Sequence, residues 1–246
     1  MSKKPLVVII TGNSNSGSSC IKELFERYSD KVNVRGVFRS KEKAQPFLEK
    51  YPKLEVITGV DAYQPETLKV AFDGADSALI VTPHDPTKGD MNDDAKLTAN
   101  MINQAVACNV KYVVLVGSIS VHTPNVCRMI ADRFVSSEHL LERLSKEKNL
   151  KYTVLRGGFF MENLLWGLKK SLKTESAITL PNIHIAMVDT RDIGKSAAAC
   201  LAANGEGHHA KYYEMNGPEM LGGEELARVL TKVFGKPIKY RSTWFF

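Results

Sequence analysis

The chain has 246 residues, of which 43% are hydrophobic and 24% are charged, and its formal net charge at pH 7 is +6. This composition is typical of a globular protein with one large α/β domain, or with one domain and a small lobe. No apolar run approaches the roughly 18 residues of a membrane span, and basic and acidic residues alternate, so we expect no membrane and no nucleic-acid partner.

Short apolar runs alternate with amphipathic helical patterns from the N-terminus to residue 156. We expect strands at 6–10, 32–38, 54–58, 77–82, 111–117 and 151–156, and helices at 18–28, 40–50, 65–72, 91–108 and 127–147. Several of the strand segments are nearly continuous β-branched and apolar runs, which is typical of strands buried on both faces of a parallel sheet. The alternation predicts right-handed βαβ crossovers and a doubly wound parallel α/β sheet.

The alternation becomes less regular after residue 156. Residues 158–180 are predicted to be mostly helical, 184–188 and 211–215 to be short strands, 192–203 and 224–234 to be helices, and 237–242 to be a last strand. Because these elements interleave, we interpret residues 1–156 as the main domain. Residues 157–246 then supply the remaining elements of the sheet and a small C-terminal lobe over the ligand cleft, in one structural unit with it.

The segment between the first strand and the first helix, residues 11–19, consists only of Gly, Ser, Asn and Thr. A buried strand followed by a small-residue loop and a helix N-terminus is how a βαβ fold binds a dinucleotide pyrophosphate. Gly12 would make the turn through a positive φ, Asn15 would replace a glycine in a left-handed conformation, and Gly17 would let the helix begin close to the sheet. Three serines would cap the helix and donate to phosphate oxygens: Ser16, Ser18 and Ser19. The alternative is an ordinary Ser/Asn turn that only caps a helix.

The end of the second strand bears on which dinucleotide is bound. NAD-binding proteins usually place an acidic residue about 20 residues after the glycines, where it accepts from the ribose 2′-hydroxyl. Here the strand continues into Arg39-Ser40-Lys41, with no acid. A guanidinium group can bind a 2′-phosphate through two hydrogen bonds and stack on adenine. The alternative is a basic start to a surface helix; the position of Arg39 favours NADP(H).

Five segments together resemble the NmrA-like branch of the atypical short-chain dehydrogenase/reductases. They are TGNSNSG after the first strand, FRSKEKA after the second, the apolar run that ends in IVTP, VVLVGSIS in and after the fifth strand, and YTVLRGGFFMENLL. The last segment is the most specific, because it carries the family's Leu-Arg followed by Phe-Met-Glu-Asn. The resemblance covers nearly the whole chain. It implies a Rossmann sheet that holds NADP(H), with a smaller C-terminal lobe over the nicotinamide.

The resemblance also implies which residues contact the cofactor. Gly12, Asn13, Asn15, Ser16 and Gly17 would lie along the pyrophosphate, Arg39 at the 2′-phosphate, Asp61 near the adenine amino group, Thr82 and Pro83 beside the cofactor, Ser118 near the nicotinamide ribose, and Phe159, Phe160 and Asn163 around the nicotinamide.

The chain departs from the family pattern at three places. The loop lacks the middle glycine of the common TGATGxxG. No tyrosine has a lysine four residues later, and the position at which many relatives keep a lysine is Ser137. Relatives usually continue for several dozen residues past the position of Phe246, so we expect a substrate pocket that is shallow, open or completed by another subunit.

These departures leave two functional hypotheses. The first is an NADPH-dependent reductase of a small hydrophobic acceptor, such as a quinone, dye or conjugated carbonyl, for which water can supply the proton. The second is a non-catalytic NADP(H)-sensing regulatory protein that binds a protein partner. A homodimer is compatible with either. A sugar-nucleotide epimerase is a third idea, which the absent Tyr-Lys pair argues against.

Four side chains are candidates for catalysis: Ser118, His122, Ser137 and Asn163. His122 is the best titratable candidate, because it follows the fifth strand at the mouth of the expected cleft; the alternative is a histidine in a solvent-facing loop. The cysteines, at positions 20, 108, 127 and 200, contain no CxxC pair and are predicted to be reduced thiols in a cytoplasmic protein. No His/Cys/Asp spacing suggests a metal site.

Overall fold

The computed structural model describes residues 3–82, 93–123, 128–167, 172 and 174–243. The chain divides into two compact units, which are described one at a time. The first unit comprises Met1–Arg156 with Arg191–Glu214, and the second comprises Gly157–Thr190 with Met215–Phe246. The C-terminal part of the sequence therefore contributes to both units. That the two together form one structural unit remains a prediction.

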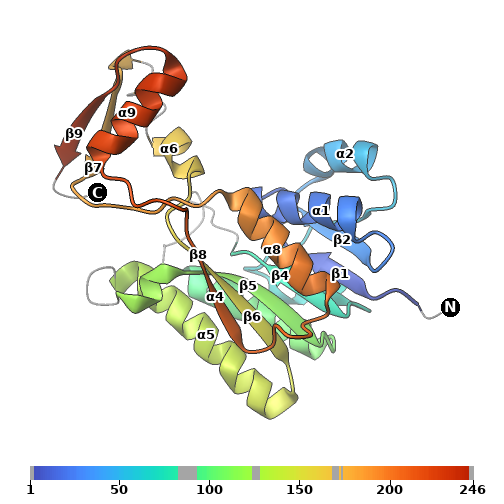
Figure 1. Ribbon diagram of the computed structural model, residues 1–246. Helices are drawn as coiled ribbons and strands as arrows, with labels where there is room; N and C mark the ends of the chain where they lie inside the picture. Colours follow the sequence, from blue (N-terminus) through green and yellow to red (C-terminus); the bar gives the residue numbers. More distant parts are fainter. Residues whose placement is uncertain (1–2, 83–92, 124–127, 168–171, 173, 244–246) are drawn as a thin grey trace. The chain divides into compact units, whose positions relative to one another are not determined.

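The first unit is built on a seven-stranded sheet whose strand order is β3-β2-β1-β4-β5-β6-β8 (Figure 1). Its strands are β1 (Leu6–Ile9), β2 (Asn33–Phe38), β3 (Glu55–Thr58), β4 (Ser77–Ile80), β5 (Tyr112–Ser118), β6 (Lys151–Gly157) and β8 (Lys211–Met215). The pairs β1–β2, β1–β4, β2–β3 and β4–β5 are parallel. The order reverses beside β1, as in the doubly wound dinucleotide-binding folds, and this confirms the predicted fold class.

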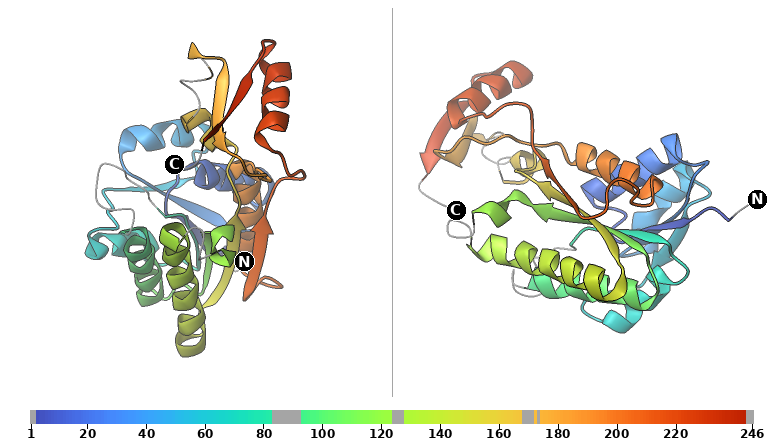
Figure 2. Two further views of the ribbon diagram at one scale, coloured as in Figure 1. Left: turned by 90° about the vertical axis from the view of Figure 1, so that its left-hand side faces the viewer. Right: turned by 60° about the horizontal axis from the view of Figure 1, so that its bottom comes forward.

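Helices cover both faces of this sheet. They are α1 (Asn15–Arg27), α2 (Lys41–Lys50), the 3-10 helix η1 (Pro65–Leu68) followed by α3 (Lys69–Phe72), α4 (Asp93–Ala107), the 3-10 helix η2 (Ile119–His122), α5 (Arg128–Lys148) and α8 (Thr190–Ala202). Helices α1 and α8 lie on one face and α4 and α5 on the other (Figures 1 and 2). Apolar residues of α4 and α5, among them Met101, Ile102 and Leu141, pack on strand residues such as Val113 and Leu115 to form the larger core.

The second unit contains α6 (Glu162–Gly167) and a two-stranded parallel sheet of β7 (Ala177–Pro181) and β9 (Lys239–Thr243), on which α9 (Gly223–Phe234) packs. Helix α9 begins where a Glu225 carboxylate oxygen accepts from the Gly222 N–H at 3.0 Å. It ends at Phe234, and the next residue, Gly235, takes the left-handed φ of 63° that glycine tolerates. The core of the second unit consists of buried aliphatic side chains such as Ile178, Leu226 and Ile238.

The sequence predicts the first unit more accurately than the second. Each strand predicted before residue 157 is present, and its ends differ from the prediction by at most two residues. Residues 177–181 form β7 although we predicted helix there, because this short segment becomes a strand by pairing with β9, 62 residues further along the chain. Residues 184–188 form no regular strand, only single bridges at Ile185 and Val188.

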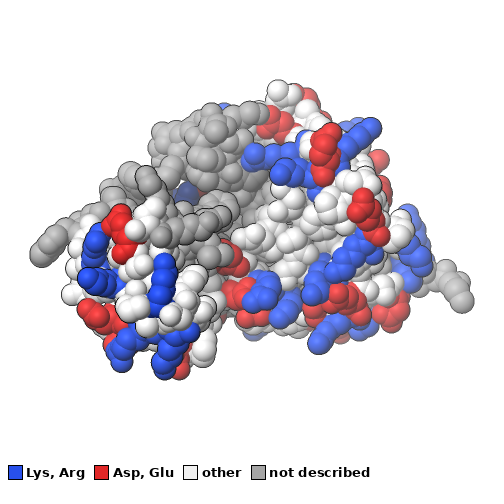
Figure 3. Space-filling model, turned by 90° about the horizontal axis from the view of Figure 1, so that it is seen from above, with Lys and Arg blue, Asp and Glu red and all other residues white. Residues whose placement is uncertain are grey.

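Basic and acidic side chains are interspersed on the surface, as their alternation along the sequence predicts. Figure 3 shows Lys and Arg mixed with Asp and Glu over the described part of the face it presents. Among the described residues, no helix combines the length and apolar character that a membrane span needs.

Candidate functional site

The loop between β1 and α1 forms a tight turn that the Ser14 side chain holds at the start of the helix. The Ser14 hydroxyl donates to the Thr11 carbonyl at 2.8 Å and accepts from the Gly17 N–H at 3.0 Å, which makes Ser14 the N-cap. Asn15 and Ser16 are then the first two helical residues, and the N–H groups at these positions have no carbonyl partner within a helix. Two donors and the positive end of the helix dipole therefore lie at the end of β1, where an anion can bind.

Glycine is required in this turn by close contacts and not by backbone conformation. A Cβ on Gly17 would lie 2.2 Å from the Thr11 carbonyl oxygen, and a Cβ on Gly12 would lie 2.8 Å from the Phe38 ring. Neither Gly12 nor Asn15 is among the described residues that have a positive φ. The predicted positive φ at Gly12 and left-handed Asn15 are therefore wrong: Asn15 is helical, and the turn is made without a left-handed residue.

The serines of the first helical turn bind backbone groups of the first unit. Ser18 donates to the Asn15 carbonyl and Ser19 to the Arg191 carbonyl, each at 2.9 Å. Ser16 is buried, and its carbonyl oxygen would lie 2.5 Å from a Cβ on Gly194. Helix α8 thus packs directly on the start of α1. The predicted capping by Ser16, Ser18 and Ser19 is wrong, because Ser14 supplies the cap.

The ends of β2, β3 and β4 place three further predicted residues along the same edge of the sheet. Arg39 is exposed and follows the last residue of β2, and the Gly12 N–H donates to the Val37 carbonyl of that strand at 2.8 Å. Asp61 follows β3, and its carboxylate accepts from the Tyr63 N–H at 3.0 Å. Thr82 follows β4. Its hydroxyl lies 2.7 Å from that of Thr98 on α4. The predicted contact residue Pro83 lies outside the described residues.

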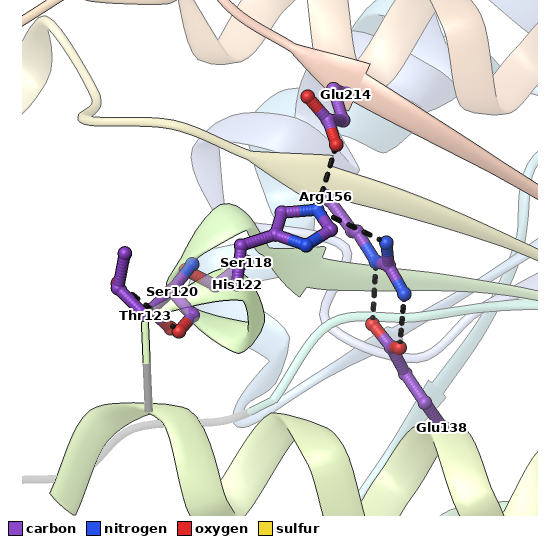
Figure 4. Close-up of polar contacts among 7 residues, drawn as sticks. All are labelled: Ser118, Ser120, His122, Thr123, Glu138, Arg156 and Glu214. Atoms are coloured by element: carbon purple, nitrogen blue, oxygen red, sulfur yellow. Dashed lines mark hydrogen bonds and ion pairs between the residues drawn. The ribbon is translucent and has the colours of Figure 1, made fainter. Parts of the chain in front are cut away.

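A second polar cluster lies at the ends of β5, β6 and β8. Ser118 is the last residue of β5, and its hydroxyl accepts from the Ser120 N–H at 3.1 Å, which starts η2. His122 ends η2, and its Nε2 atom lies 2.7 Å from an Oε1 oxygen of Glu214 on β8 and 3.3 Å from an Nη1 atom of Arg156 on β6 (Figure 4). The predicted catalytic histidine thus lies between a carboxylate and a guanidinium group.

Arg156 is fixed by a bidentate ion pair with Glu138 of α5. The Arg156 guanidinium donates to both carboxylate oxygens, at 3.0 and 2.7 Å, and the two side chains are 16% and 8% exposed. The hydrogen bonds that Arg156 donates to Glu138 raise the pKa of Arg156 above its ordinary value. The guanidinium also lies 4.3 Å above the Tyr212 ring. The sequence motif named Arg156, but we assigned no partner to it, and we did not single out Glu138 or Glu214. The only feature of the sequence that could have pointed to Glu138 and Glu214 was that both are charged.

Ser137 is buried, and its hydroxyl donates to the Arg133 carbonyl of its own helix at 3.0 Å. A catalytic role for Ser137 stays a prediction. Asn163 is exposed in α6 of the second unit, whereas Ser118 and His122 belong to the first. That Asn163 and the first-unit residues share one pocket also stays a prediction.

Residues 159–163, with the sequence FFMEN, make several of the contacts of the second unit. Phe160 forms a parallel bridge with Val188. Phe159 packs on the core of the second unit. Together with Leu180 and Leu226, it lines an apolar cavity of about 20 Å³. The Glu162 carboxylate accepts from the Thr190 N–H at 3.2 Å and from the Thr190 hydroxyl. Glu162 thereby caps α8, a role that the sequence analysis did not assign.

The described cysteines are free thiols. Cys20 and Cys200 are buried, and Cys108 is half-buried. Burial raises the pKa of both Cys20 and Cys200. Cys127 lies outside the described residues. Within the part of the chain that the structure describes, no three His, Cys, Asp or Glu side chains are grouped as a metal site would need.

Comparisons with known proteins agree with this geometry. The chain is 26% identical over 239 residues to the NAD(P)H azoreductase of Xenophilus azovorans, covering 96% of this chain and 76% of that protein. The structure of Citrobacter sp. triphenylmethane reductase complexed with NADP(H) superposes with a TM-score of 0.80 at 23% identity, covering 97% of this chain and 79% of that one. NmrA, a negative transcriptional regulator, superposes with a TM-score of 0.74 at 13% identity, covering 98% and 75%. The family model described as NAD(P)H-binding matches residues 12–204, and the chain therefore belongs to this NAD(P)H-binding family.

Proposed function

We propose that the protein is an NADPH-dependent reductase that transfers hydride to a small hydrophobic acceptor, a quinone, a dye or a conjugated carbonyl. The observation that carries the proposal is the turn from β1 to α1. It presents the Asn15 and Ser16 N–H groups at a helix N-terminus, and there is no room for a side chain at Gly12 or Gly17. This arrangement fits a pyrophosphate, which needs donors and a close backbone approach.

The remaining cofactor contacts follow from the edge of the sheet. Arg39 at the end of β2 would bind the 2′-phosphate and so select NADPH over NADH. Asp61 would lie near the adenine, with Thr82 and Pro83 along the cofactor and Ser118 near the nicotinamide ribose. Bound NADPH would supply the hydride, while the protein would position the acceptor and direct the transfer of a proton to it.

The nature of the acceptor is supported by the relatives and by the absent Tyr-x-x-x-Lys pair. The two reductases named above are described as acting on azo compounds and on triphenylmethane dyes. Phe159, Phe160 and Asn163 would contact the nicotinamide and the acceptor, with Asn163 orienting a polar atom. The reaction class needs no strong base, because a quinone or dye accepts hydride without prior deprotonation.

A non-catalytic NADP(H) sensor that binds a protein partner is the second candidate function. It is favoured by the missing lysine at Ser137 and by the fold likeness to NmrA, a negative transcriptional regulator.

One experiment separates the two. NADPH oxidation is followed at 340 nm with a panel of quinones, azo dyes and triphenylmethane dyes, while NADPH binding is measured by calorimetry. Binding together with turnover of at least one acceptor class supports the reductase. Binding without turnover across the panel refutes the reductase and leaves the sensor.

A further inference from the structure

His122 is held by Glu214 in one defined protonation pattern. The distance of 2.7 Å between Nε2 and the Glu214 oxygen is a short hydrogen bond, and an ionised carboxylate can only accept. Nε2 also lies 3.3 Å from Arg156 Nη1, which can only donate, but the contact with Glu214 is the shorter of the two and assigns the proton of the neutral ring to Nε2. The second nitrogen, Nδ1, is turned away from Glu214 (Figure 4) and is left to exchange a proton with another group. The histidine side chain is 50% exposed, so it can be reprotonated from solvent.

The ring has charged neighbours of both signs, Glu214 and Arg156. Arg156 is the described cation nearest to Nε2, but its charge is already compensated by the bidentate contact with Glu138. The Glu214 carboxylate contacts His122 directly, so it is placed to balance the positive charge when the ring takes up a second proton. One further acid faces the cluster from α5: Glu142 accepts from the Tyr212 hydroxyl at 2.6 Å. His122 contacts Glu214 and Arg156, while Glu138 and Glu142 of α5 contact Arg156 and Tyr212.

The cluster also lies where an acceptor should bind. Ser118 is the last residue of β5, and Arg156 and Glu214 are the next-to-last residues of β6 and β8. Ligands of doubly wound sheets bind beyond the carboxyl ends of the strands. The same end of the sheet carries the phosphate-binding turn after β1.

We propose that Glu214 is a positioning residue that fixes His122 as the proton donor for acceptors whose reduction consumes a proton; this rests on the proposed reductase function. A quinone takes up a hydride and one proton to become a hydroquinone. The proton leaves His122 Nδ1 for the acceptor oxygen, and the ring recovers a proton from water. A triphenylmethane cation takes up only a hydride, which forms the new C–H bond and neutralises the positive charge. Its reduction does not need His122.

The test compares both acceptor classes in one protein. Wild type, Glu214→Gln and His122→Asn are assayed with a quinone and with a cationic triphenylmethane dye, and Glu206→Gln, an exposed glutamate of the same unit, is the matched control. We expect both cluster variants to lose kcat for the quinone on the order of 100-fold, since general acids contribute roughly 10²- to 10⁴-fold. The rate with the dye should change less than about twofold, because hydride transfer alone uses no general acid.

A second readout needs neither cofactor nor acceptor. The ¹⁵N shifts of the His122 ring, assigned by comparison with His122→Asn, report which nitrogen carries the proton. We expect the Nε2–H form in wild type and in Glu206→Gln, and a mixture of both forms in Glu214→Gln.

Three results would overturn the inference. They are an Nδ1–H ring in wild type, an unchanged quinone rate in the variants, or an equal loss with both acceptors, which would mean a general structural defect. If wild type oxidises NADPH with neither acceptor, the proposed reductase function fails and the donor role fails with it. The ring shifts then still decide separately whether Glu214 orders His122.

Discussion

Removing the Glu138 carboxylate should destabilise the first unit strongly. In Glu138→Ala, the Arg156 guanidinium loses both of its carboxylate hydrogen bonds while remaining largely buried. Breaking one side of a buried pair costs about 3–5 kcal/mol, because the remaining charge stays uncompensated. The lower end applies here, since Arg156 is 16% exposed and keeps its contact with the Tyr212 ring. We therefore expect a loss of about 3 kcal/mol.

Urea denaturation followed by far-UV circular dichroism measures this loss, with Arg27→Ala as control. Arg27 forms an ion pair with Glu23 on the surface of α1 and is 72% exposed, so its removal should cost less than about 1 kcal/mol. The double variant Glu138→Leu/Arg156→Leu should recover much of the loss, since it leaves no unpaired buried charge. A cost for Glu138→Ala no larger than that of the control would refute the reasoning.

Three further predictions concern the cofactor and the thiols. Arg39→Ala should reduce the preference for NADPH over NADH about 10- to 100-fold, as a charge-assisted contact is worth about 1.5–3 kcal/mol; equal affinities in wild type, measured by calorimetry, would contradict this. Gly17→Ala should weaken NADPH binding and lower stability by about 1–3 kcal/mol, because the new Cβ would meet the Thr11 carbonyl at 2.2 Å; unchanged binding and denaturation midpoints would argue against it. Cys20 and Cys200 should resist iodoacetamide at pH 8 until the protein unfolds, because burial raises the pKa of both thiols; mass spectrometry of the alkylated native protein checks this, and rapid labelling would disprove it.

Regular hydrophobic patterns made the first unit predictable. Its strands are short apolar runs separated by helices of ordinary length, so a local pattern was sufficient to place them. The residues after β1 and β2 were also identifiable from their neighbours in sequence, because the carboxyl ends of parallel strands share one edge. The second unit depends on pairing between distant segments, and AITLP carries no local sign that it pairs with residues 239–243.

The contacts within the site could not be predicted from the sequence, because they join residues that are far apart along the chain. The sequence predicted a phosphate-binding loop at residues 11–19, but it did not show that Phe38 and the Thr11 carbonyl are what exclude side chains at Gly12 and Gly17. It named His122, yet gave no sign of Glu214, which lies 92 residues away along the chain and comes within 2.7 Å in the fold. Such polar contacts are set by strand order, which local patterns do not reveal.

The reaction proposed for this protein is hydride transfer from NADPH to a bound acceptor. The most direct measurement uses NADPH carrying deuterium at C4, in separate (4R) and (4S) preparations, with a cationic triphenylmethane dye, and analyses the colourless product by mass spectrometry. We predict one deuterium on the central carbon from one of the two preparations and none from the other. Binding of NADPH without any reduced product, or a product without deuterium from either preparation, would contradict the account.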